Sequence, residues 1–352
     1  MLPKFVFDEE PKAPVTIPEN ASTPLKEFLG AISKVPEMCD LSSKKITLVD
    51  GSHTAHRAFN VLSDLKTSSG TPTGLVMGAM NSIHFYDERE KPDATFILWD
   101  FGKSKFRTNL YPEYKQSRNT GEPTDEDVAR YESLIFQLQE VRQMFSYLGY
   151  PQLGVPGVEA DDLIGILTHI LKPHCQKINI VTGDKDMWQL IDSNVDIYDG
   201  MQKKWITIDS VIEKFGVKPE QIIYQKAICG DGSDNIPGVK GVGPKTAATV
   251  LNQFKDLDEV FSNSEEVGKM TRAAKIIEDE TLVRRNLKLV KIITDDYSIL
   301  EDKQIEPITQ FLNTYIPLVG KPRTVDRKNF IRRCVDLEFN SIIEYLEKWT
   351  GI

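Results

Sequence analysis

Three apolar runs that each lead into an aspartate constrain the fold of this 352-residue chain more than any other feature. Short apolar runs rich in β-branched side chains predict strands that are buried on both faces. The runs are ITLVD (46–50), ATFILWD (94–100) and INIVTGD (178–184). The amphipathic segments that predict helices lie at 73–90, 124–148 and 159–171. This alternation predicts an α/β domain with a central, mostly parallel sheet.

The aspartates that end these runs are Asp50, Asp100 and Asp184. In an open parallel sheet the carboxyl ends of the strands meet at one edge, and ligands bind outside that edge. A single aspartate in such a place is commonly a turn residue or a helix N-cap. Three of them at one edge indicate a shared acidic site.

Three further motifs add acidic residues. GVEADDLIGIL (157–167) places Glu159 and Asp162 three residues apart on one helix face, with Asp161 beside them in the first turn, where the helix dipole favours negative charge. A cluster of N-terminal capping residues is the alternative interpretation of this motif. The other two motifs are GDKDMWQLI (183–191), which adds Asp186, and GDGSDN (230–235), which adds Asp231 and Asp234.

Packed together without cations, these carboxylates would repel one another strongly, because the local dielectric constant is low. Oxygen ligands without histidine or cysteine suit Mg²⁺, for which Mn²⁺ can substitute. Two such ions about 4 Å apart can activate a water molecule and stabilise the leaving oxygen of a phosphodiester. The candidate metal ligands are Asp50, Asp100, Glu159, Asp161, Asp162, Asp184, Asp186, Asp231 and Asp234.

The formal net charge of −9 is unusual for a protein that binds nucleic acid, since such proteins carry a basic face toward the phosphates. A local basic segment is nevertheless present: Lys103, Lys105, Arg107, Lys115 and Arg118 stand against one acid, Glu113. No apolar run approaches the roughly 20 residues that span a bilayer, and the first residues lack the apolar stretch of a signal peptide. The four cysteines are single and far apart, which predicts reduced thiols. We therefore expect a cytoplasmic protein.

The glycine-rich segment GDGSDNIPGVKGVGPKTAATVL (230–251) follows the last acidic residues directly. Its glycines permit tight turns and close approach of the backbone to a ligand. Pro244 suits the first position of a helix, and the unpaired N–H groups at a helix start can bind phosphate. The segment thus predicts a nucleic-acid contact beside the acidic site.

Six motifs in this order resemble the 5′-nuclease superfamily, which comprises flap endonucleases, the 5′-nuclease domain of bacterial DNA polymerase I and phage 5′→3′ exonucleases. They are VDGSHTAHRAF, FILWD, YPEYKQSR, VEADDLIG, VTGDKDMWQLI and GDGSDNIPGVKGVGPKTA. The length and helical character of the C-terminal region are most similar to the phage replication RNase H branch, which would place the protein in a host-cell cytoplasm. The resemblance implies a PIN-like α/β domain with a helical arch, a helix-hairpin-helix element of the H2TH type and a C-terminal helical region.

On this basis we divide the chain into four parts. Residues 1–43, with six prolines, are expected to form an irregular arm, either a surface-packed extension or a docking peptide for a partner. The catalytic domain is expected over 44–229, with the arch around 101–135. The helix-hairpin-helix element is expected over 230–280 and the C-terminal helical region over 281–352.

The resemblance also implies residue roles. Five of the acids would serve one Mg²⁺ site: Asp50, Asp100, Glu159, Asp161 and Asp162. The other four would complete or flank the site of a second ion: Asp184, Asp186, Asp231 and Asp234. Lys115 and Arg118 would reach the scissile phosphate, and Tyr114 would stack on a terminal base. Arg57 would contact a phosphate. The implied duplex contacts are Lys240, Gly241, Gly243, Lys245 and Thr246, with a K⁺ ion held by the hairpin.

Two residues depart from the family pattern. Thr246 stands where many relatives carry a second basic residue, which would either weaken the duplex grip or shift it to Lys240. His56 stands where an aromatic residue is common, and His53 lies three residues before it. This histidine pair lacks the further nearby ligands that a zinc site requires.

The implied function is a Mg²⁺-dependent, structure-specific 5′ nuclease, a 5′→3′ exonuclease or flap endonuclease, that hydrolyses DNA and RNA primers during replication. Its partners would be DNA with 5′ flaps or ends, RNA–DNA hybrids, and replisome proteins such as a single-strand-binding protein or sliding clamp, contacted through the arm or the C-terminal region. We expect a monomer that binds no membrane. One alternative is a non-catalytic subunit that binds branched DNA. Another is a topoisomerase- or primase-like Mg²⁺ domain, which would not explain the glycine-rich segment.

Overall fold

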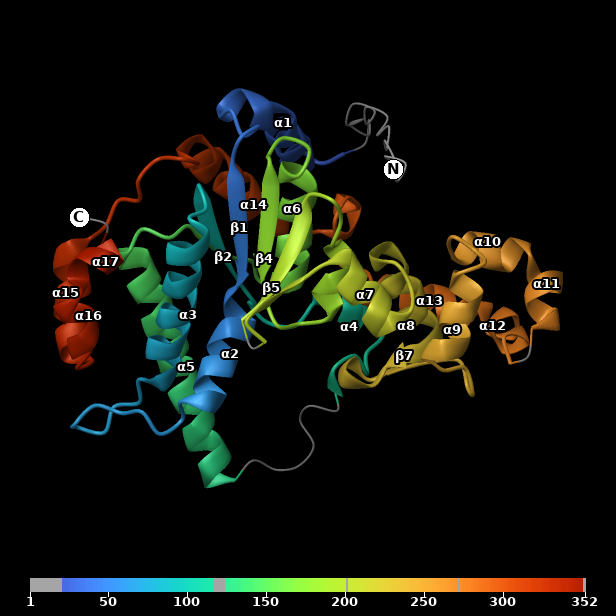
Figure 1. Cartoon of the computed structure of the whole chain (residues 1–352), viewed down its shortest axis with the longest axis horizontal. Coiled ribbons are helices and arrows are strands. Elements are labelled where there is room, and N and C mark those ends of the chain that lie inside the picture. The colour runs from blue at the N-terminus through green and yellow to red at the C-terminus, as the bar shows by residue number, and fades with distance from the viewer. Residues whose placement is uncertain (1–20, 117–123, 201, 271, 351–352) are drawn as a thin grey trace, which may run out of the picture.

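A six-stranded sheet forms the centre of the computed structural model, which describes residues 21–116, 124–200, 202–270 and 272–350 (Figure 1). The strand order is β3-β2-β1-β4-β5-β6. The strands are β1 (Lys45–Asp50), β2 (Ala94–Trp99), β3 (Gln152–Gly154), β4 (Lys177–Val181), β5 (Val195–Asp199) and β6 (Lys204–Ile206). β6 pairs antiparallel with β5, and the other pairs are parallel. The prediction of a mostly parallel α/β sheet is therefore confirmed.

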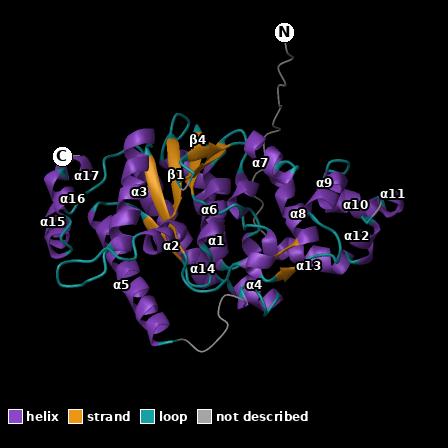
Figure 2. Cartoon of the chain, turned by 60° about the horizontal axis from the view of Figure 1, so that its bottom comes forward, coloured by secondary structure: helices purple, strands orange, loops and turns teal. Residues whose placement is uncertain are grey.

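Helices cover both faces of this sheet, as Figure 2 shows. Alternate side chains of β1 enter different cores, because successive side chains of a strand point to opposite faces. Leu48 packs in the core that includes residues of α1, α6 and α14, whereas Val49 packs in the core that includes residues of α2, α3 and α5. These helices are α1 (Thr23–Met38), α2 (Gly51–Val61), α3 (Gly74–Glu90), α5 (Asp125–Tyr147), α6 (Ala160–Leu171) and α14 (Asp302–Tyr315).

A lobe of short helices extends from the end of the sheet that carries β5 (Figure 1). A two-stranded hairpin, β7 (Gly230–Asp231) with β8 (Ile236–Pro237), lies within it. The helices of the lobe are α7 (Ile208–Phe215), α8 (Ile222–Cys229), α9 (Pro244–Leu251), α10 (Leu257–Ser262), α11 (Ser264–Lys269), α12 (Ala274–Glu278) and α13 (Glu280–Val290). Helix α4 (Lys105–Leu110) packs against α13 and so connects the segment after β2 to this lobe.

The expectation of an irregular arm is wrong for residues 23–38, which form α1. Two prolines in this stretch suggested irregular backbone, but Pro24 occupies the first turn of the helix, where proline is tolerated, and Pro36 lies near its last turn. Phe28, Ile32 and Val35 form a buried stripe on α1, and α1 packs against α14. Burial of this stripe outweighs the poor helix propensity of proline. Residues 1–20 of the expected arm lie outside the described residues.

Three short helices end the described chain and pack on α3 and α5. They are α15 (Arg327–Asp336), α16 (Asn340–Glu344) and α17 (Leu346–Thr350). The side chains of Phe330 and Cys334 are fully buried in the same core as Val49. Within the described ranges, no helix has both the length and the apolar character needed to cross a membrane.

Candidate active site

Asp50 is the last residue of β1 and the N-cap of α2. Its Oδ1 accepts a hydrogen bond from the backbone N–H of His53 at 2.9 Å, and its Oδ2 accepts one from the hydroxyl of Thr182 at 3.0 Å. The carboxyl group is buried, and this burial together with the charge of Asp100 raises the pKa of Asp50 to about 7. A buried carboxylate that resists ionisation in this way would be stabilised by a nearby cation.

Asp100 follows β2 and connects that strand to the VEADD motif. Its Oδ1 accepts a hydrogen bond from the backbone N–H of Ala160 at 2.7 Å, so the Asp100 carboxylate caps the first turn of α6. The backbone N–H of Asp100 donates to the hydroxyl of Ser52 at 2.7 Å. The acid at the end of β2 therefore lies at the start of α6, and its charge acts on Asp50 at the end of β1, as expected for neighbouring parallel strands.

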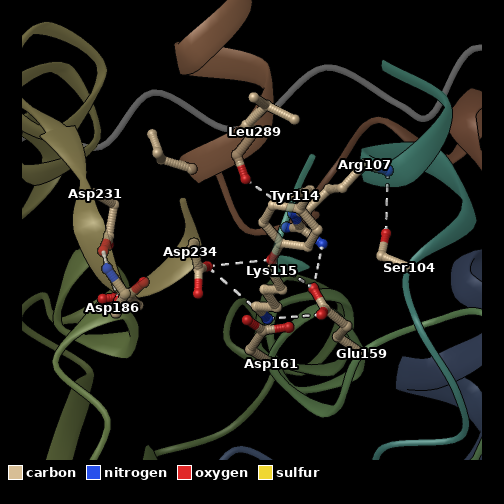
Figure 3. A network of polar contacts seen from close by, with 12 residues as sticks. Ser104, Arg107, Tyr114, Lys115, Glu159, Asp161, Asp186, Asp231, Asp234 and Leu289 are labelled. Atoms are coloured by element: carbon tan, nitrogen blue, oxygen red, sulfur yellow. Dashed lines mark hydrogen bonds and ion pairs between the residues drawn. The ribbon is translucent and has the colours of Figure 1, made fainter. Parts of the chain in front are cut away.

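Glu159 lies at the centre of a network of polar contacts at the start of α6 (Figure 3). Its carboxylate accepts hydrogen bonds from Lys115 at 2.7 Å, Arg107 at 3.0 Å and the Tyr114 hydroxyl at 3.1 Å. Asp161 lies beside it, and burial together with the charges of its acidic neighbours raises the pKa of Asp161 well above its usual range. The cluster at this point thus retains excess negative charge.

Asp162 has no exposed surface, and its oxygens already have partners. Its Oδ2 lies 2.6 Å from Nη1 of Arg107, and its Oδ1 accepts from Nη2 of Arg107 at 2.9 Å and from the backbone N–H of Ile293 at 3.0 Å. One oxygen of each of Glu159, Asp161 and Asp162 lies within 4.8 Å of the others. Because Asp162 is committed to Arg107, the arrangement favours a structural role for Asp162 over the metal-ligand role expected from the sequence.

A second group of acids surrounds Lys226, which lies on α8. The Lys226 ammonium donates to Oδ2 of Asp231 at 2.6 Å and also to Oδ1 of Asp186. Burial raises the pKa of Asp186 to about 6. Burial would also raise the pKa of Asp231, but Lys226 and hydrogen bonds from Ser233 together lower it. This lysine was not identified from the sequence, because it lies in none of the recognised motifs.

The remaining two predicted acids lie next to these groups. Asp184 is exposed, and its Oδ1 accepts from the backbone N–H of Asp186 at 2.9 Å. Asp234 accepts from the Tyr114 hydroxyl at 3.2 Å and lies 3.9 Å from the Lys115 ammonium. The hairpin of the lobe therefore meets the YPEYK motif at the same acidic site.

Tyr114 does not have the position that the resemblance implied. Its side chain is only 3% exposed and its hydroxyl donates to Glu159 and Asp234. In this conformation the ring is covered and has no free face for a base, so the expected stacking role is not supported. Lys115 adopts a left-handed backbone conformation, with φ of 55°. Arg118 lies outside the described residues.

Arg57 lines a cavity of about 230 Å³ between α2, α3 and the β5–β6 turn. Lys203 and the half-exposed ring of Phe85 line the same cavity. His53 lines this cavity and also a larger one of about 540 Å³ beside Asp184, Asp231 and Lys226. The predicted phosphate contact at Arg57 is therefore adjacent to the acids.

The glycine-rich segment follows the β7–β8 hairpin and leads into α9, which begins at Pro244 with Gly243 as its N-cap. Gly241 has φ of 84°, a conformation that side chains disfavour. Lys240, Gly241, Gly243 and Lys245 are exposed, whereas Thr246 is half-buried. The Lys240 carbonyl accepts from Lys275 at 3.4 Å. The exposed residues precede or begin α9, where its first N–H groups are unpaired.

The carboxylates that remain available fit a divalent cation. The acidic groups are hard oxygen donors. Burial, with a further contribution from acidic neighbours, raises the pKa values of Asp50, Asp161 and Asp186, so a nearby cation would favour their charged forms. Within the described part of the chain, the one group of three His, Cys, Asp or Glu residues close enough to share a metal contains only acids, and of these Asp162 is paired with Arg107. The donor chemistry therefore suits Mg²⁺ or Mn²⁺.

The amino-acid sequence of this chain is similar to those of known proteins. Residues 45–216 match the family model of the 5′-3′ exonuclease N-terminal resolvase-like domain, and residues 217–308 match that of the 5′-3′ exonuclease C-terminal SAM fold. The 5′-3′ exonuclease of Aquifex aeolicus is 33% identical over 72% of this chain and 83% of its own length. The DNA polymerase I of Rhizobium leguminosarum is 34% identical over 76% of this chain, but the match covers only 27% of that polymerase.

Solved structures show the same fold. The bacteriophage T5 flap endonuclease, in a pseudo-enzyme-product complex with DNA and metal ions, superposes with a TM-score of 0.67 at 23% identity. That match covers 78% of this chain and 99% of the phage chain. The family models and the curated relatives together show that this chain belongs to the 5′-3′ exonuclease family.

Proposed function

We propose that this chain is a divalent-metal-dependent 5′ nuclease that hydrolyses phosphodiesters at 5′ ends and 5′ flaps of DNA and removes RNA primers paired with DNA. The observation that carries this proposal is the convergence of acids from the ends of β1 and β2, the start of α6, the segment after β4 and the β7–β8 hairpin. A protein that only binds branched DNA gains nothing from acids that repel phosphates. The acid set therefore favours hydrolysis over the non-catalytic alternative.

Each part of the site has a task in this proposal. Two divalent ions, held by the acids other than Asp162, would supply Lewis acidity toward the scissile phosphate and lower the pKa of the attacking water. Lys115 would leave Glu159 when a substrate is present and donate to the phosphoryl oxygens, where negative charge develops. Arg118, three residues on, would do the same.

The glycine-rich segment would hold the duplex while the acids act on its 5′ end. Lys245 and the first N–H groups of α9 would contact the phosphate backbone, with a K⁺ ion at the turn before the helix. Arg57 would contact a phosphate on the other side of the acids. The protein would act as a monomer in the cytoplasm and meet a single-strand-binding protein or a sliding clamp through its N-terminal residues or its C-terminal helices.

A cleavage assay tests the proposal. A 5′-labelled flap, a nicked duplex and an RNA primer annealed to DNA are each incubated with the protein in Mg²⁺ or in EDTA. We expect cleavage of all three substrates in Mg²⁺ and none in EDTA. Cleavage of the DNA substrates but not of the primer would remove RNA from the substrate class, and binding without any cleavage would support the non-catalytic alternative.

A further inference from the structure

Lys226 places a positive charge between two of the acids proposed to hold the second ion. Its ammonium donates to one oxygen of Asp231 and to one oxygen of Asp186, which come from different segments. Figure 3 shows these two carboxylates turned toward each other. The Lys226 side chain is only 16% exposed, so solvent screens its contacts weakly. The ammonium therefore lies where a cation shared by the two carboxylates would lie.

The position of Lys226 is set by a well-packed helix. The neighbouring residues Gln225 and Ala227 are buried, and the amide of Gln225 donates to the carbonyls of Phe215 at 2.9 Å and Pro244 at 3.1 Å. Helix α8 thus holds the Lys226 backbone in place. The side chain, in contrast, adjoins the open cavity of about 540 Å³ that Lys185 and Phe215 also line. The ammonium can leave the carboxylates without a change in α8.

We propose that Lys226 is a built-in counter-ion, which neutralises Asp186 and Asp231 in the metal-free protein and must move away before a divalent ion binds between them. This inference rests on the proposed function, because it assumes a second ion in the site. Lys226 is a positioning residue in this role: it sets how strongly the second ion is held. Lys226 keeps two half-buried carboxylates compensated when the ion is absent, at the expense of weaker binding of that ion.

A phosphate-binding lysine would behave differently. If Lys226 only contacted substrate, its removal would weaken DNA binding. The affinity for the ion would then rise only as much as it does when another nearby lysine is removed. A counter-ion competes with the ion directly for the same oxygens. Its removal should tighten ion binding by about tenfold or more, because charges at contact distance in a partly buried site interact strongly.

The test measures Mn²⁺ binding without nucleic acid, by electron paramagnetic resonance of the free ion. We compare the full-length wild-type protein with Lys226→Met, which removes the ammonium, and Lys226→Arg, which keeps a positive charge. Lys185→Met is the matched control, because Lys185 lies in the same cavity, is exposed and contacts no carboxylate among the described residues. Circular dichroism verifies that each variant is folded.

We expect Lys226→Met to bind the more weakly held Mn²⁺ ion about tenfold more tightly than wild type. Lys226→Arg should bind this ion no more tightly than wild type. Lys185→Met should change the affinity for it by less than about threefold. The metal-free Lys226→Met protein should melt at a lower temperature than wild type and recover in Mn²⁺. If Lys226→Met failed to fold without metal but folded in Mn²⁺, that result would also support the counter-ion role. Unchanged or weaker Mn²⁺ binding in Lys226→Met, or equal tightening in Lys185→Met, would overturn it. A wild-type protein that binds two Mn²⁺ ions but cleaves no flap would contradict the proposed function and not the role of Lys226.

Discussion

Asp162 and Arg107 form a two-point ion pair in the interior, with oxygen–nitrogen distances of 2.6 and 2.9 Å. Arg107 also donates to Glu159 at 3.0 Å and to the backbone carbonyl of Leu289 on α13 at 2.8 Å. The pair therefore links the start of α6 to the helical lobe and fixes the Glu159 carboxylate. Because both of its oxygens contact Arg107, Asp162 is less available to a metal ion than the other acids of the site.

Replacement of Asp162 by alanine should destabilise the protein by about 3–5 kcal/mol, because it leaves the buried Arg107 guanidinium without its main partner. Urea unfolding in EDTA measures this loss. The double variant Asp162→Leu with Arg107→Met should recover much of the stability, since both charges are removed. A stable Asp162→Ala protein with lost Mn²⁺ affinity would instead make Asp162 a metal ligand.

The contribution of Asp50 to the stability of the metal-free protein should fall as the pH rises from about 4 to about 7. The pKa of Asp50 is about 7 in the folded protein against an ordinary value of 3.8. Between these values the unfolded chain has lost a proton that the folded protein retains, so each increase in pH favours unfolding. Melting temperatures in EDTA across this range measure the slope. Asp50→Asn should flatten it, and a slope of equal size in that variant would show that Asp50 does not cause it.

Lys115→Ala should slow single-turnover cleavage by about 2.7–4 kcal/mol of activation free energy, the usual loss for one donor that stabilises developing charge. Binding of a flap in Ca²⁺ should change far less. Lys105→Ala is the control, because Lys105 pairs with Glu301 at the surface. If Lys115→Ala lost as much flap affinity as cleavage rate, Lys115 would be a simple binding contact.

Lys245→Ala should weaken binding to duplexes of different sequence by the same factor and reduce the salt dependence by about one counter-ion. Affinity for single-stranded DNA should hardly change. Lys34→Ala, on the exposed face of α1, controls for the loss of one positive charge. The assignment would be wrong if single-stranded DNA lost as much affinity as a duplex, or if the salt dependence were unchanged.

Patterns that depend on periodicity and spacing predicted the fold well. The apolar runs ending at Asp50 and Asp100 correspond to β1 and β2, and the amphipathic segments correspond to α3, α5 and α6. The prolines of α1 favour irregular backbone, whereas the stripe of Phe28, Ile32 and Val35 favours the helix that the structure shows. That stripe has helical spacing and was visible in the sequence.

The pairing of charges at the site was not visible in the sequence. Arg107 lies in a basic segment whose composition is typical of an exposed surface. In the structure Arg107 is buried against Asp162, 55 residues away in the sequence. Lys226 meets Asp186, 40 residues away, through the packing of α8 beside the segment after β4. Which acid has a protein cation as its partner depends on tertiary contacts of this kind, and sequence spacing carries no signal for them.

We propose that the uncompensated acids hold the ions required for cleavage, and the variant Asp161→Asn tests this role most directly. Asp161 has a strongly raised pKa because burial and acidic neighbours disfavour its charge. The variant should therefore melt at a higher temperature than wild type in EDTA, bind flap DNA at least as well, and cleave it at least about a thousandfold more slowly in Mg²⁺. Cleavage of the labelled flap by Asp161→Asn at close to the wild-type rate would contradict the account.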